Sequence, residues 1–216
     1  MPRLWNTVLI LLAIFGISAS IVSEVPDEPG KPEAIQIDHA TATFQVGTNM
    51  PGLLVKGKSD AVQARVQIRR NADGVTLDHV SAQLPVKTLA TGIALRDQHM
   101  LEHIFTTPDG QIPDVKFEAE GAACPGVTAG QEASCKVSGT LSIRGTPRNF
   151  SVVLKIREGS SSTPVFRAAG DGIVKLSEYG IDQPTQFGVK TDNQIQLHFE
   201  FPENPATALD TRAGRQ

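Results

Sequence analysis

Apolar and polar residues alternate along much of this chain. Every even position of residues 62–68 carries an apolar side chain: Val62, Ala64, Val66 and Ile68. The odd positions between them carry Gln63, Arg65 and Gln67. A period of two places the apolar side chains on one face of a β-strand and matches no helical period. The segment therefore predicts a strand with one apolar face.

The alternation recurs along the chain in eight segments, which are residues 42–46, 62–69, 80–86, 115–119, 137–143, 150–156, 166–176 and 195–201. Amphipathic strands joined mostly by short turns are typical of an antiparallel sheet with one apolar and one solvated face. Such a sheet hides its apolar face by closing into a barrel or by folding into two layers, and closure also removes the exposed edges. We predict an all-β fold, an eight-stranded antiparallel β-barrel, with the even residues of 62–68 and the odd residues of 137–143 pointing inward.

One stretch, Lys87 to Phe105, lacks the alternation. Its apolar residues follow no period of two, and Gly92 interrupts it. We expect a short helical connection between strands 3 and 4. Long ordered connections at a barrel mouth often act as lids.

The first 23 residues have the pattern of an export signal. Arg3 is followed by an apolar run, residues 8–17, and then by the small residues Ser18, Ala19 and Ser20. The run is shorter than the ~20 apolar residues of a membrane span, and the small residues suit a signal peptidase. We expect a periplasmic or secreted protein with residues 1–23 as signal peptide; an uncleaved anchor is the alternative.

The rest of the chain divides by composition. Residues 24–33 are acidic and rich in proline, which predicts a linker. Residues 34–203 are long enough for one barrel domain with a sizeable core, and residues 204–216 are expected to form a flexible tail.

Charge and cysteine content narrow the partners and the compartment. The formal net charge is −3 and aromatic residues make up 5% of the chain, so nucleic acid is a poor partner. The only two cysteines, Cys124 and Cys135, lie close together in the sequence. In an exported chain such a pair predicts a disulfide.

The predicted inner face mixes small and large residues. Ala64, Ala82 and Gly172 leave room inside the barrel, whereas Phe44 and Phe117 fill it. The composition alone leaves two outcomes open, a barrel with room for a slender ligand and a barrel packed solid.

Four motifs resemble the YceI-like family, and they occur in the family's order. They are Arg96-Asp97-Gln98-His99-Met100, then Ile104-Phe105 with Pro113-Asp114-Val115-Lys116-Phe117, then the hairpin 137–148, and finally Ser177-Glu178-Tyr179-Gly180-Ile181. The resemblance implies an exported, extended lipocalin-like barrel that binds polyisoprenoid lipids. Leu176 departs from it, because many members carry Arg at this position.

From the pattern and the resemblance together we expect a non-catalytic binder of an isoprenoid-type lipid or a quinone, with no metal and no cofactor; a homodimer is left open. The expected ligand-binding residues of the interior are Phe44, Val62, Val66, Leu84, Phe117, Leu141, Phe150, Leu154, Phe166, Leu197 and Phe199. Arg96 and His99 are candidates for contact with a polar lipid head, although Arg96 and Asp97 also suit a local ion pair and helix cap.

Two alternatives to the binder remain. His99, Glu102 and His103 form a His-x-x-Glu-His pattern, which on a long helix binds zinc beside a glutamate base. Here Pro108 and Gly110 follow closely, so the long helix is missing. The other alternative is a structural or stress-related protein whose barrel is packed solid.

Overall fold

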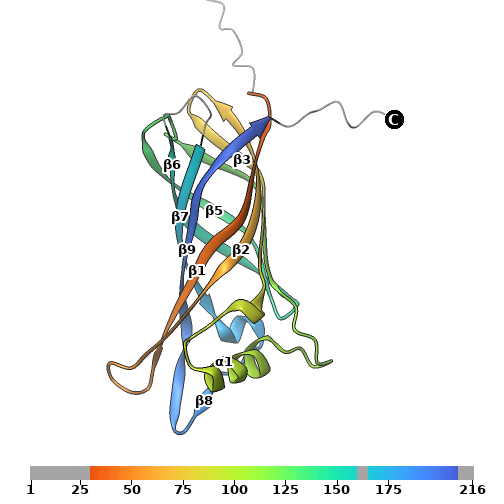
Figure 1. Cartoon of the computed structure of the whole chain (residues 1–216), viewed down its shortest axis with the longest axis vertical. Helices are drawn as coiled ribbons and strands as arrows, with labels where there is room; N and C mark the ends of the chain where they lie inside the picture. Colours follow the sequence, from red (N-terminus) through yellow and green to blue (C-terminus); the bar gives the residue numbers. More distant parts are fainter. Residues whose placement is uncertain (1–29, 160–164, 209–216) are drawn as a thin grey trace, which may run out of the picture.

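A computed structural model describes residues 30–159 and 165–208. It shows a closed barrel in which each strand pairs antiparallel with its neighbours, in the order β1-β2-β3-β4-β5-β6-β7-β9, and β9 pairs with β1 to close it (Figure 1). The strands are β1 (Glu33–Thr48), β2 (Leu54–Asn71), β3 (Gly74–Leu84), β4 (Val115–Pro125), β5 (Glu132–Ile143), β6 (Thr146–Glu158), β7 (Val165–Lys175) and β9 (Val189–Ala208). The predicted eight-stranded antiparallel barrel is confirmed.

A ninth strand and four short helical segments lie outside the barrel wall. Strand β8 (Thr185–Gln186) forms a hairpin with the start of β9. Between β3 and β4 the chain forms a 3₁₀ turn (Val86–Thr88), helix α1 (Ala94–Met100) and a π-helical turn (Leu101–Phe105), and a second 3₁₀ turn (Leu176–Tyr179) follows β7. The expected helical connection between strands 3 and 4 is therefore present. Within the described part of the chain, all helices are too short to cross a bilayer.

The predicted inward faces are those that the barrel buries. Ile68 is 1% exposed and Val137 is fully buried, whereas Arg65 and Gln67 face solvent. Because the barrel strands turn most of their apolar positions inward, the core of the protein is the barrel interior.

Several strands are longer than the alternating segments because β-bulges shift their parity. In β1, Ile35 and Ile37 face inward from odd positions, and Ala40 and Ala42 face inward from even ones. The register of β1 against β2 shifts between these two stretches. Bulges add the twist and curvature that a small barrel needs in order to close.

The ends of the chain also differ from the predicted bounds. Strand β1 starts at Glu33, the last residue of the predicted linker, and β9 continues through Ala208, where Glu33 pairs with it. The signal peptide 1–23, most of the linker and residues 209–216 lie outside the described residues.

The two ends of the barrel are different. At the helical end lie the connection between β3 and β4, the β1–β2 turn and the β8–β9 hairpin; at the terminal end β1 begins and β9 finishes (Figure 1). The connection is fixed to β2 at the helical end, where the backbone groups of Lys58 and Ala90 exchange two hydrogen bonds of 2.9 Å. Beside them the hydroxyls of Ser59 and Thr88 lie 2.6 Å apart.

Charged groups around Arg70 connect strands at the terminal end. Arg70 on β2 donates to Glu158 on β6 at 2.6 Å and to Glu33 on β1 at 3.1 Å, and its guanidinium lies 5.2 Å from the centre of the Phe166 ring. In the strand order β2 and β6 are opposite each other, so this ion pair crosses the barrel.

The predicted disulfide between Cys124 and Cys135 is confirmed, with a Cα–Cα distance of 5.0 Å. It joins β4 to β5 beyond the stretch in which these strands pair, which covers only Lys116–Ala119 of β4.

Candidate ligand-binding cavity

The barrel encloses an apolar cavity of about 220 Å³. All eight barrel strands contribute to its lining. Every interior residue expected from the sequence is part of it: Phe44, Val62, Val66, Leu84, Phe117, Leu141, Phe150, Leu154, Phe166, Leu197 and Phe199.

The free space lies in the middle of the barrel rather than at its ends. Inward side chains at mid-height, such as Val66, Leu154 and Leu197, keep some accessible surface. Toward the terminal end Ile68 is 1% exposed, and toward the helical end Val86 is fully buried. The interior surface left accessible is therefore greatest at mid-height.

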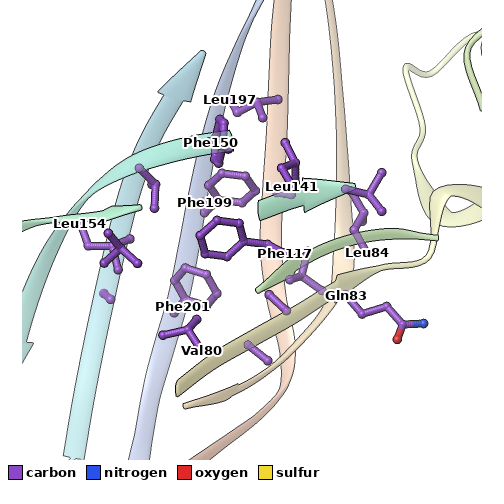
Figure 2. Close-up of a pocket in the computed structure, with 18 of the residues that line it drawn as sticks. Val80, Gln83, Leu84, Phe117, Leu141, Phe150, Leu154, Leu197, Phe199 and Phe201 are labelled. Atoms are coloured by element: carbon purple, nitrogen blue, oxygen red, sulfur yellow. The ribbon is translucent and has the colours of Figure 1, made fainter. Parts of the chain in front are cut away.

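Four phenylalanines form the centre of the cavity (Figure 2). The rings of Phe117 and Phe150 meet edge to face with centroids 5.9 Å apart, and those of Phe199 and Phe201 stack at 6.5 Å. Phe201 was not among the expected site residues, although it shares the inward parity of Leu197 and Phe199. Its odd position in the alternating segment 195–201 was the signal from which it could have been predicted.

Some of the small inward residues accommodate these rings instead of leaving space. A Cβ added at Gly172 would overlap the ring of Phe150, and one added at Gly57 would overlap the ring of Phe44. Small and large residues interlock at these points, and the cavity is the space that remains between them.

The lining carries no charged side chain among the described residues. Its polar side chains are Thr43 and Gln83. The hydroxyl of Thr43 donates to the backbone oxygen of His198, and the amide of Gln83 donates to Asp114 at 2.6 Å. Figure 2 shows the Gln83 amide directed away from the phenylalanine rings. The cavity therefore offers a ligand apolar contact and shape, and no charged group of the described residues.

The helical connection covers the cavity at one end. Leu89, Met100, Ile104 and Phe105 line it from this segment. Leu89, Met100 and Ile104 belong to the apolar residues that broke the strand pattern in the sequence. These residues give the connection the position of a lid over the cavity.

Arg96 and His99 lie in the same connection but do not line the cavity. The guanidinium of Arg96 donates to the hydroxyl and the backbone oxygen of Thr91, and the carboxylate of Asp97 accepts from the Thr91 backbone N–H at 2.8 Å. These bonds fix the start of α1. Contact of Arg96 or His99 with a polar ligand head stays a prediction.

The residues of the alternative zinc site also lie away from the cavity lining. The rings of His99 and His103 meet edge to face at 5.7 Å, and Glu102 accepts a hydrogen bond from Gln98. Among the described residues no group of three or more His, Cys, Asp or Glu side chains could hold a metal ion.

The sequence model of the YceI-like domain matches residues 34–202, which is most of the chain. The chain belongs to the YceI-like family. Leu176, where the sequence motif differs from many members, lines the cavity with an apolar side chain. This YceI-like barrel therefore has no charged group at that position.

Solved structures share the fold at low sequence identity. The YceI protein of Campylobacter jejuni is 17% identical with a TM-score of 0.58, and the match covers 73% of this chain and 88% of that one. BcnA of Burkholderia cenocepacia is 13% identical with a TM-score of 0.57, covering 74% and 94%. A polyisoprenoid-binding domain of Saccharophagus degradans, implicated in plant cell wall breakdown, is 14% identical with a TM-score of 0.55, covering 81% and 98%. No curated protein sequence matches the chain.

Proposed function

We propose that this YceI-like protein is a non-catalytic binder that holds one long apolar molecule inside the barrel. The observation that carries the proposal is the cavity, which is enclosed by eight strands and lined without a charged side chain. Thr43 and Gln83 use their polar groups within the protein, so the lining presents no nucleophile, acid or base to a bound molecule.

The ligand class that we propose is an isoprenoid-type lipid, either a free polyisoprenoid or the tail of a quinone. Its support comes from the family and from the polyisoprenoid-binding domain that shares the fold. A cavity of ~150 Å³ with a similar apolar lining binds benzene, and the present one measures about 220 Å³. It accommodates a slender branched chain segment, and each Å² of apolar surface buried contributes ~25 cal/mol.

We also propose that the protein is exported to the periplasm or secreted after removal of about the first 20 residues. The pattern of residues 1–23 and the disulfide support this, because disulfides persist in oxidising compartments. Mass spectrometry of the protein isolated from its host tests it. An intact Met1 in a cytoplasmic fraction would contradict export.

The direct test of the binder function is solvent extraction and mass spectrometry of protein purified from its own host without detergent. We expect one isoprenoid or quinone per chain, and the spectrum identifies which. A bound zinc ion without lipid, or a protein that carries no small molecule, would overturn the proposal.

Two neighbouring residues of β6 provide a matched pair of variants. Leu154 lines the cavity, and Val153 is exposed on the outside of the same strand. Leu154→Asn is expected to abolish lipid co-purification, because it places an unpaired amide in the apolar cavity, whereas Val153→Asn retains the lipid. His99→Ala with His103→Ala is also expected to retain it, and loss of the lipid only in this double variant would favour a site at the histidines.

A further inference from the structure

Exposed apolar side chains concentrate at the helical end of the barrel. Eight large apolar side chains are exposed among the described residues, and two of them, Val153 and Ile173, lie within β6 and β7 rather than at the helical end. The other six are on three segments of the helical end: Met50, Leu53, Leu54, Ile93, Leu95 and Phe187. A monomer that meets only water rarely gathers such residues at one place.

These three segments also lack charge. Residues 47–55, 88–95 and 183–189 contain no Asp, Glu, Lys or Arg. We call them the uncharged tips. The first charged residues on their C-terminal sides are Lys56, Arg96 and Lys190. The terminal end differs, because charged groups such as Arg70 and Glu158 lie there.

Phe187 is the most exposed of these apolar side chains. It is 92% exposed and has a φ of 51°, in the left-handed region that disfavours a residue with a Cβ. It precedes Gly188, in a two-residue hairpin turn for which Asn-Gly is the favoured pair. Neither burial within the protein nor turn geometry explains a phenylalanine at this position.

Two of the tips are held together. The Asn49 backbone N–H donates to the oxygen of Lys190, the Asn49 side chain donates to the oxygen of Gly188, and the Lys190 N–H donates back to the side chain of Asn49. The β1–β2 turn is therefore fixed to the β8–β9 hairpin. Figure 1 shows both reaching beyond the barrel at the end where α1 lies.

From these observations we infer that the uncharged tips insert into the interfacial region of a phospholipid bilayer. Several separate apolar tips suit a fluid surface, because their side chains enter the acyl region while Lys56 and Lys190, the charged residues that directly follow two of the tips, reach the phosphates. In this position the connection that covers the cavity faces the membrane. The inference rests on the proposed function, because docking of the tips would serve the exchange of a lipid with the bilayer.

A tryptophan placed at a tip tests the insertion in the processed protein isolated from its host. The single native tryptophan, Trp5, lies within the residues that the proposed export removes, so an introduced tryptophan is the only one present. Phe187→Trp then reports from a tip, and Ile173→Trp is the matched control on the barrel wall. With vesicles of phosphatidylcholine and phosphatidylglycerol, we expect a blue shift and quenching by brominated acyl chains for Phe187→Trp only. Equal quenching at both positions, or none at Phe187→Trp, would overturn the inference.

Substitutions at the tips give a second, independent test. Phe187→Asn suits the left-handed turn, so it should keep or raise the melting temperature while it lowers vesicle partitioning about tenfold. Leu53→Ser with Leu54→Ser should likewise lower vesicle partitioning. Val153→Ser with Ile173→Ser, which removes a similar exposed area from the wall, should leave partitioning unchanged. Equal losses in both sets would contradict insertion of the tips.

Three further outcomes separate this inference from its alternatives. If the tips make no contact with vesicles, and substitutions in them dissociate a dimer in sedimentation experiments, this surface binds a second copy of the chain. That result would overturn the inference. A lipid-loaded barrel that does not bind vesicles would refute the docking alone. An empty barrel that still binds them would refute the proposed function alone.

Discussion

Filling the cavity with larger side chains should exclude the ligand and stabilise the ligand-free protein. Ala82 on β3 and Ala168 on β7 both line the cavity and are incompletely buried. Ala82→Leu combined with Ala168→Leu occupies space that the structure shows to be free. A ligand-binding barrel and a solid one respond to this change in opposite ways.

The expected gain follows from the size of the cavity. An empty cavity lowers stability by ~24 cal/mol per Å³, so filling all of the roughly 220 Å³ would be worth at most about 5 kcal/mol. The two substitutions together add six carbon atoms, and at ~0.8 kcal/mol for each buried CH₂ the gain is again about 5 kcal/mol. Ordering two leucine side chains costs about 1–2 kcal/mol. We expect the free energy of unfolding to rise by about 3 kcal/mol.

The assay is urea unfolding of the delipidated protein, accompanied by solvent extraction of each variant purified from its host. Ala123→Leu, on the exposed face of β4, is the control and should change neither quantity. A double variant destabilised by about 1–3 kcal/mol through overpacking, or one that still carries a full complement of lipid, would refute the reasoning.

Three further predictions concern stability. Cys124→Ser with Cys135→Ser should lower the free energy of unfolding by about 3 kcal/mol in urea titrations, and reductant should have the same effect on the native protein. Arg70→Met should lower the free energy of unfolding by about 3 kcal/mol in the same assay, because it leaves the Glu158 carboxylate, 6% exposed, without its partner. A loss of stability smaller than that from breaking a surface ion pair would contradict a barrel-spanning ion pair. Burial raises the pKa of Tyr179 from 10.0 to about 12, so the neutral phenol favours folding. This contribution to the free energy of unfolding, about 2–3 kcal/mol, is fully present below pH 10 and is lost as the pH rises through 12. The same loss of stability at high pH should be absent in Tyr179→Phe.

The sequence predicted the strands wherever one parity persisted and failed where a bulge changed it. In β2 the segment 62–69 was recognised, but the strand begins at Leu54. Ser59 and Val62 both face inward, one from an odd and one from an even position, and the register against β1 shifts between them. A pattern search with a fixed period of two stops at such a point, because the extra residue breaks the period without ending the strand.

The lining of the cavity was also predictable, whereas its volume was not. Inward parity was enough to find Phe117 or Leu141, since closure sends all such positions to one interior. Whether that interior was solid depended on where each ring lies, for example the Phe150 ring over Gly172. The Arg70–Glu158 ion pair had no local signal either, because its partners are 88 residues apart and meet only when the barrel closes.

Under the proposed function, the difference between the two ends of the barrel predicts where a ligand enters and leaves. Opening the terminal end would separate β2 from β6 against the Arg70–Glu158 ion pair, and the disulfide restrains β4 and β5 nearby. At the helical end the cover is a connection outside the barrel wall, attached to β2 by the two Lys58–Ala90 hydrogen bonds, by the contact between the Ser59 and Thr88 hydroxyls and by apolar contacts. A bilayer can replace the apolar contacts, because its acyl chains offer an apolar environment to side chains such as Met100 when the connection lifts. Under the proposed function, we therefore expect a lipid to exchange at the end that carries the uncharged tips, where the membrane would offset the exposure of the cover.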